Sequence, residues 1–186
     1  TTTLKQGKWD RHLFVGTELH GKTLALLGCG RIAQHVAKIA QGFQMNVIAF
    51  DPFVDEAKMK ALNITKTATL EQMLQQADIL SLHLPHTPKT HHLIDAEELQ
   101  VMKPTAIVIN CARGGIINEQ ALHTALQTNQ LAGAGIDVWE TEPDTTNPLQ
   151  DLPNVVAVPH LGASTHEAQT RVSEITVQKI LTCTPG

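Results

Sequence analysis

Three polar side chains, far apart in the chain, each follow an apolar run typical of a buried strand. They are Arg113, Glu142 and His160. A guanidinium clamps a carboxylate through two parallel hydrogen bonds, an imidazole exchanges a proton near neutral pH, and a carboxylate can orient that imidazole. The three residue types together suit a reaction in which a substrate carboxylate is held while a proton moves. The preceding runs cover residues 105–110, 132–138 and 154–158.

A glycine-rich turn near the start of the chain has the residues needed to bind a dinucleotide. Gly28, Gly30 and Ala33 fit the pattern G-x-G-x-x-G/A, between an apolar run and a helical stretch. Such a turn lets a pyrophosphate approach the backbone and the N-terminus of the helix. Asp51 follows Gly30 by roughly 20 residues, the offset at which an acid binds a ribose. A plain strand-to-helix turn would also explain the glycines, but the order of turn, helix and acid favours a dinucleotide site.

Asp51 also indicates which dinucleotide is bound. A carboxylate accepts hydrogen bonds from the two ribose hydroxyls, whereas it would repel the 2′-phosphate of NADP. Neither Pro52 nor Phe53 offers a cation to neutralise that phosphate. The sequence therefore predicts NAD as the cofactor.

Alternating apolar runs and helical stretches provide a scaffold for these residues. This alternation predicts an α/β fold with a doubly wound, mostly parallel sheet between two helical layers, a Rossmann-like NAD-binding domain. Ligands of such a sheet bind at the carboxyl ends of the strands, so all the candidates should share one edge. We expect strands at 23–27, 46–50, 78–84, 105–110, 132–138 and 154–160, and helices at 32–40, 70–77, 95–102, 118–129 and 164–181. Periodicity places Ile32, Val36 and Ile39/Ala40 on one apolar face, and Thr69 with Gln72 and Ser164 with Glu167 have the spacing of capping boxes.

Each catalytic candidate also has a simpler interpretation. Arg113 could be a surface arginine, Glu142 could be solvated in a polar loop, and His160 could merely end a strand. The adjacent Gly114–Gly115 pair suggests backbone close to a ligand. Convergence on one edge favours hydride transfer at a carbon that bears a hydroxyl next to a carboxylate. Arg113 would hold the carboxylate, His160 would exchange the hydroxyl proton, and Glu142 would orient His160.

Further residues near this edge remain open to two interpretations. Asp137 could simply end a strand or accept a bond from the nicotinamide amide. Cys111 could be a nucleophile, but a small residue lining the cofactor is the simpler interpretation. Four histidines lie in a proline-rich loop without a cysteine or acid at ligand spacing, so we expect solvated side chains and no metal. They are His83, His86, His91 and His92.

Composition excludes several classes of protein. The chain has 186 residues, 17% of them charged, and a formal net charge of −4, so neither a nucleic-acid surface nor a membrane-binding surface is expected. Three widely spaced cysteines and no signal-peptide pattern favour the reducing cytoplasm. The chain lacks an initiator Met, which suggests processing or excision. We expect residues 1–20, with Trp9 and Phe14, to form an entry segment packed on the outside of the sheet.

Several segments resemble the D-isomer-specific 2-hydroxyacid dehydrogenases. They read LLGCGRIAQHVAKIA, IAFDP, NCARGGIINEQAL, AGAGIDVWETEP and PHLGAST. The resemblance implies that Arg113, Glu142 and His160 are catalytic. It also implies cofactor contacts, through the backbone alone at Leu84, which stands where relatives often have Thr. The implied contact residues are Gly28, Gly30, Arg31, Ile32, Asp51, Leu84, Cys111, Ala112, Arg113, Asp137, His160, Leu161, Gly162 and Ala163.

The resemblance also sets expectations for the whole protein. Residues 21–186 would be the NAD-binding domain, and the family's substrate-binding domain has no counterpart here, so the chain alone should bind NAD(H) but turn over poorly. Its first and last segments are most similar to members that oxidise D-3-phosphoglycerate in serine biosynthesis. D-lactate, glycerate or glyoxylate remain alternative substrates, and an NAD-sensing module like the family's corepressors remains an alternative role. A homo-oligomer is expected by analogy.

Overall fold

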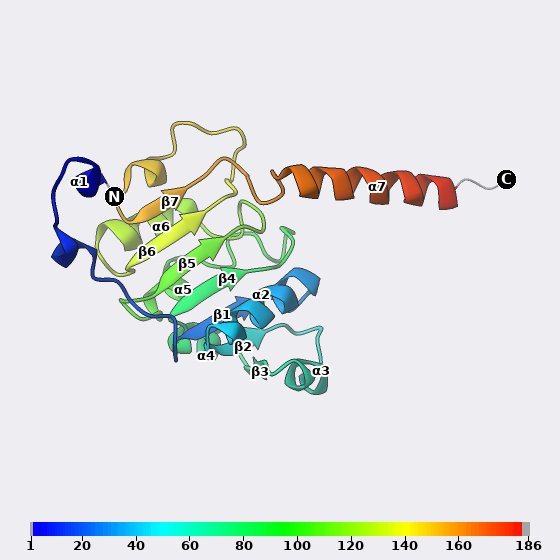
Figure 1. Ribbon diagram of the computed structural model, residues 1–186. Helices are drawn as coiled ribbons and strands as arrows, with labels where there is room; N and C mark the ends of the chain where they lie inside the picture. The colour runs from blue at the N-terminus through cyan, green and yellow to red at the C-terminus, as the bar shows by residue number, and fades with distance from the viewer. Residues whose placement is uncertain (1, 184–186) are drawn as a thin grey trace.

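The computed structural model describes residues 2–183 and contains one seven-stranded sheet (Figure 1). All its strand pairs are parallel, in the order β3-β2-β1-β4-β5-β6-β7, so the expected doubly wound α/β fold is confirmed. The strands are β1 (Thr23–Leu27), β2 (Asn46–Phe50), β3 (Thr65–Lys66), β4 (Ile79–Leu82), β5 (Ile107–Asn110), β6 (Gly133–Ile136) and β7 (Val155–Ala157). The helices are α1 (Thr2–Lys5), α2 (Arg31–Gly42), α3 (Glu56–Ala61), α4 (Leu70–Gln76), α5 (Ala96–Gln100), α6 (Glu119–Gln127) and α7 (His166–Cys183), with 3-10 turns η1 (Arg11–Phe14) and η2 (Pro148–Asp151).

Alternation along β1 divides the core between the two faces of the sheet. Leu24 and Leu26 pack in the cluster that includes side chains of α2 and α3. Ala25 and Leu27 pack in the larger cluster, which includes side chains of α4, α5 and α6. Successive side chains of a strand point to opposite faces, so β1 is buried on both sides. The strand order reverses between β1 and β4, which is where an open parallel sheet binds its ligand.

Helix α2 buries small residues, not the isoleucines that its periodicity suggested. Ala33, Ala37 and Ala40 are buried, at helical spacing, whereas Ile32 and Ile39 are 72% and 63% exposed. A helix that follows a tight glycine turn lies close to its strand, and only small side chains fit in that narrow space. The expected apolar face at Ile32, Val36 and Ile39/Ala40 was therefore wrong for the isoleucines.

Two helix starts also differ in detail from the expected capping boxes. The Thr69 hydroxyl accepts a bond from the backbone N–H of Gln72, 3.1 Å away, and so caps α4. No return bond from Gln72 to Thr69 occurs among the described residues, so this is a simple cap. At α7 the capping hydroxyl belongs to Thr165, which accepts from the N–H of Ala168, and not to Ser164.

The two ends of the described chain lie away from the sheet (Figure 1). Trp9 is 79% exposed and Phe14 is 52% exposed, so most of the surface of both side chains is open to solvent. Residues 2–20 form the short α1 and η1, neither of which contributes a buried side chain. Helix α7 projects from the sheet with nearly all its residues exposed, including Val172 and Ile175. No described helix is both long and apolar enough to cross a bilayer.

Candidate active site

The glycine turn after β1 has the shape of an anion cradle. Gly28 has φ +91°, and a Cβ there would lie 2.7 Å from the carbonyl oxygen of His83, so only glycine fits. Gly30 is the N-cap of α2, without a side-chain capping bond, and no heavy atom lies within 4 Å of the Cβ position there. The N–H of Gly28 donates to the carbonyl oxygen of Phe50, so the N–H groups of the first turn of α2 and the open space at Gly30 are what fit a pyrophosphate. Arg31 and Ile32 form the exposed first turn of α2 beside that space.

Asp51, at the end of β2, ties this turn to the neighbouring strand. Its Oδ2 accepts from the backbone N–H of Cys29 at 2.8 Å, and its Oδ1 accepts from the N–H of Phe53 at 2.8 Å. The two bonds hold the carboxylate beside the glycine turn. This is the place that a ribose-binding acid requires in such a fold.

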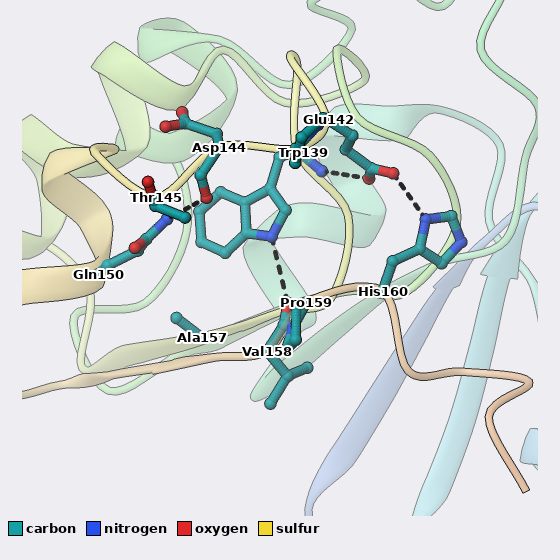
Figure 2. Close-up of a pocket in the computed structure, with 10 residues that line it drawn as sticks. Trp139, Glu142, Asp144, Thr145, Gln150, Ala157, Val158, Pro159 and His160 are labelled. Atoms are coloured by element: carbon teal, nitrogen blue, oxygen red, sulfur yellow. Dashed lines mark hydrogen bonds and ion pairs between the residues drawn. The ribbon is translucent and has the colours of Figure 1, made fainter.

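Glu142 and His160 form a hydrogen-bonded pair at the same edge of the sheet (Figure 2). His160 Nδ1 lies 2.8 Å from Glu142 Oε2, and Glu142 Oε1 accepts from the backbone N–H of Trp139 at 2.9 Å. The carboxylate therefore holds the ring through Nδ1 and leaves Nε2 available to a substrate. Half of the His160 side chain is exposed, so a small molecule can reach the ring.

The surroundings of Glu142 keep it ionised. The hydrogen bond from His160 is the largest cause, followed by the bond from the N–H of Trp139, and together they lower the pKa of the carboxyl below its usual value. The positive charge of Arg113 acts in the same direction. An ionised Glu142 accepts the N–H of His160 and stabilises the imidazolium that forms when this ring takes a proton.

Arg113 follows β5 in a loop that a buried amide holds. The side chain of Asn110, 3% exposed, donates to the carbonyl oxygen of Arg113 at 3.0 Å and accepts from the N–H of Ala112 at 3.1 Å. The guanidinium is exposed and donates to the carbonyl oxygen of Ala112 at 2.5 Å. This loop places the arginine on the edge that carries Glu142 and His160.

Asp137 anchors the loop that carries His160. Its buried carboxylate accepts from the N–H of Leu161 at 2.5 Å and from that of Gly162 at 2.8 Å. His160 has φ +54°, a conformation that costs a non-glycine residue about 1–3 kcal/mol. The two bonds to Asp137 hold the backbone next to it. From the sequence, Asp137 could be either a strand end or a nicotinamide contact. The anchoring role could not be predicted, because its partners Leu161 and Gly162 lie 24 and 25 residues further along the chain.

The remaining cofactor candidates lie in or beside these loops. Leu84, just beyond β4, packs half-buried against the larger core cluster. The carbonyl oxygen of Ala163 accepts from the side chain of Gln169 at 2.9 Å. Desolvation and the Asp137 carboxylate raise the pKa of the Cys111 thiol, which disfavours the nucleophilic thiolate.

The four loop histidines were expected to be solvated: His86 and His91 are exposed, whereas His83 and His92 are partly buried. His83 lies 2.9 Å from the hydroxyl of Ser81, and burial lowers its pKa. His86 Nε2 and His91 Nδ1 are 3.1 Å apart, and His92 stacks on His91. Within residues 2–183 no group of three or more histidines, cysteines or acids is arranged to hold a metal ion.

A cavity of about 630 Å³ lies beside the Glu142–His160 pair. The indole of Trp139 forms its wall, together with residues of the loop after β6 and the end of β7 (Figure 2). This edge of the sheet therefore carries both an acid–base pair, Glu142 and His160, and a glycine turn suited to an anion.

Comparison with known proteins agrees with this geometry. Residues 1–162 match the family model described as D-isomer specific 2-hydroxyacid dehydrogenase, NAD binding domain. The chain is 44% identical over 180 residues to a D-3-phosphoglycerate dehydrogenase of Methanocaldococcus jannaschii, covering 97% of this chain and 34% of that protein. It is also 44% identical over 184 residues to a D-3-phosphoglycerate dehydrogenase of Bacillus subtilis, covering 99% of this chain and 35% of that protein.

Solved structures show the same fold. A glyoxylate reductase from Paecilomyes thermophila superposes with a TM-score of 0.87 at 32% identity, covering 96% of this chain and 54% of that chain. The TT0316 protein from Thermus thermophilus also has a TM-score of 0.87, at 38% identity, covering 97% of this chain and 57% of that chain. The chain thus spans about a third of the length of the curated relatives it matches. It belongs to the D-isomer specific 2-hydroxyacid dehydrogenase family, as an NAD-binding domain of that family.

Proposed function

We propose that this chain is the cofactor domain of a D-3-phosphoglycerate dehydrogenase, which oxidises D-3-phosphoglycerate to 3-phosphohydroxypyruvate and supplies serine biosynthesis. The observation that carries the proposal is the Glu142–His160 pair, 2.8 Å apart, on the edge that also carries the glycine turn. Curated relatives at 44% identity with this activity support the choice of substrate.

Three side chains carry the reaction in this proposal. Arg113 binds the substrate carboxylate through its planar guanidinium and polarises the oxygen on C2. His160 Nε2 removes the proton from the C2 hydroxyl, and the resulting imidazolium is stabilised by the carboxylate of Glu142 at Nδ1. In the reverse direction His160 returns that proton to the C2 oxygen. NAD, when bound, supplies the acceptor for the hydride that leaves C2.

The residues that would hold NAD are those of the edge described above. Gly28 and Gly30 would bind the pyrophosphate at the N-terminus of α2, and Asp51 would bind the adenosine ribose. Arg31 and Ile32 would extend that surface. The nicotinamide half would contact residues from the loops after β4, β5, β6 and β7, namely Leu84, Cys111, Ala112, Arg113, Asp137, His160, Leu161, Gly162 and Ala163.

The proposal assigns the rest of the substrate pocket to a second domain outside residues 1–186. The chain spans about a third of its curated relatives, which leaves room for such a domain in the whole protein. Isothermal titration of the 186-residue chain with NADH should show binding, and a steady-state assay beside it should show little turnover. Full activity of this chain alone would contradict the second domain's role.

A substrate screen on the intact protein tests the choice of hydroxy acid. D-3-phosphoglycerate should be oxidised with the highest kcat/KM, ahead of D-lactate and D-glycerate. A preference for one of these smaller acids would leave the proposed reaction unchanged but would show that D-3-phosphoglycerate is not the substrate. No turnover with any of them, together with NAD binding, would favour the NAD-sensing module.

We also propose a homo-oligomer in the cytoplasm. Exposed Trp9, Phe14 and Val156 support an interface with a second copy, because apolar side chains are costly to leave in water. Free Cys29 and Cys111 are consistent with a reducing compartment. Sedimentation velocity on the intact protein should show a dimer or a larger species, and a monomer at micromolar concentration would contradict the proposal.

A further inference from the structure

Trp139 lies where the three loops that carry Arg113, Glu142 and His160 meet. It follows β6, the indole is almost buried at 6% exposure, and the ring stands between Glu142 and the end of β7 (Figure 2). Each of the three loops touches a different group of Trp139. These groups are the carbonyl, the backbone N–H and the indole N–H.

The first contact is with the arginine loop. A Cβ built on Gly114, the residue after Arg113, would lie 1.8 Å from the carbonyl oxygen of Trp139 and 2.2 Å from its carbonyl carbon. The backbone of Gly114 therefore lies directly on the Trp139 peptide, and any larger residue there would displace it.

The other two contacts are hydrogen bonds. The backbone N–H of Trp139 donates to Glu142 Oε1 at 2.9 Å, which leaves Oε2 aimed at His160. The indole N–H donates to the carbonyl oxygen of Val158 at 3.1 Å, two residues before His160. The acid and the histidine are therefore tied to the same residue from opposite sides.

Strand pairing alone gives His160 weak support. β7 is a three-residue edge strand, its Val156 is 68% exposed, and the strand ends at Ala157, three residues before His160. Beyond the strand, the N–H of Val158 donates to the carbonyl oxygen of Ile136 at 3.0 Å, and Asp137 holds Leu161 and Gly162. The indole of Trp139 adds the bond to the carbonyl oxygen of Val158, on the side of that residue that leads to His160.

We propose that Trp139 is a positioning residue, which fixes Arg113, Glu142 and His160 relative to one another and so sets the rate of the proton and hydride transfer. The kinetic part of this inference rests on the proposed function. A buried tryptophan that only fills the core would affect stability but not the geometry of the Glu142–His160 pair.

Trp139→Phe in the intact protein tests this role, because phenylalanine keeps an aromatic ring and both main-chain contacts of residue 139 but loses the indole N–H bond to Val158 and part of the ring volume. One such hydrogen bond corresponds to roughly a three- to tenfold fall in kcat, with the KM for NAD unchanged. Gly114→Ala disturbs the contact between the arginine loop and the Trp139 carbonyl, and it should lower kcat at least as much. Met59→Leu, a buried substitution in α3 on the other side of the sheet, is the control and should leave kcat unchanged.

A titration separates positioning from packing without any substrate. The intact protein is labelled with ¹³C at the glutamate carboxyls, and Glu142→Gln assigns the signal of Glu142. Since the bond from His160 is the main reason that the pKa of Glu142 is low, Trp139→Phe should raise this pKa toward its ordinary value. Met59→Leu should leave it where it is.

The outcomes distinguish the two proposals. If the wild type oxidises no 2-hydroxy acid, the proposed function fails, and the titration still decides the role of Trp139. If Trp139→Phe and Gly114→Ala both keep kcat within a factor of 1.5 and leave the Glu142 titration unchanged, the positioning role is overturned. A loss of thermal stability without a change in kcat or in that titration would likewise reduce Trp139 to a packing residue.

Discussion

The two halves of the proposed active site are built in different ways. The nucleotide half is local: Gly28, Gly30 and Asp51 belong to one β-α-β unit, and its main tie joins Cys29 to Asp51, 22 residues apart. The catalytic half joins the loops after β5, β6 and β7 through the contacts of Trp139 with Gly114 and Val158 and the bond between Glu142 and His160. Changes in the catalytic half that abolish turnover should therefore leave cofactor binding intact. Changes in the nucleotide half that abolish cofactor binding should abolish turnover as well.

Removal of the imidazole is the strongest way to separate the two halves. His160→Ala in the intact protein should lower kcat by about 10² to 10⁴, the usual contribution of a general acid–base group. NADH affinity by isothermal titration should change little. His166→Ala, an exposed histidine at the start of α7, is a matched control and should keep full activity. If His160→Ala keeps a third or more of wild-type kcat, the proposed mechanism is wrong.

A pair of glycine substitutions sharpens the description of the nucleotide half. Gly28→Ala forces a side chain into a positive-φ position against the carbonyl of His83, so it should cost on the order of 2 kcal/mol of stability. Gly30→Ala meets open space and a negative φ, so its thermal melting should match the wild type while NADH binding weakens. Equal melting temperatures for both variants would refute this distinction.

Asp51→Asn tests cofactor choice, with a smaller expected effect. Loss of the charge should weaken NADH binding about tenfold, because hydrogen bonds to a charged group contribute about 1.5–3 kcal/mol. Binding of NADPH should improve at the same time, since the carboxylate no longer repels the 2′-phosphate. Unchanged discrimination between the two cofactors would show that another residue makes the selection.

The smallest predicted effect concerns the stability of the Glu142–His160 pair against pH. The pKa of Glu142 is lowered in the folded chain, so its carboxylate stabilises the fold above the ordinary value of 4.5. That contribution is lost as pH falls through the lower, folded value. Both side chains are more than a third exposed, so the effect is small. The melting difference between wild type and Glu142→Gln should be constant above about pH 5 and shrink below it; a difference that widens in acid would contradict this sign.

The sheet, most of its elements and the residues of the proposed site could be predicted from the sequence, but some side-chain positions could not. Periodicity predicts Ile32 and Ile39 of α2 against the core, where alanines lie, because periodicity alone does not report how close a helix approaches its strand. β3 could not be predicted, because its two residues carry no pattern.

The residues themselves determined the alternation of strands and helices, the glycine turn with its acid, and which side chains have the chemistry for a dehydrogenase. These features depend on local conformational preferences and on residue spacing, and both are set by residues that are close together in the sequence. The distance from Glu142 to His160, the anchoring of Leu161 and Gly162 by Asp137, and the meeting of three loops at Trp139 were decided by tertiary structure. Such contacts exist only once the parallel strands pair and bring distant loops to one edge.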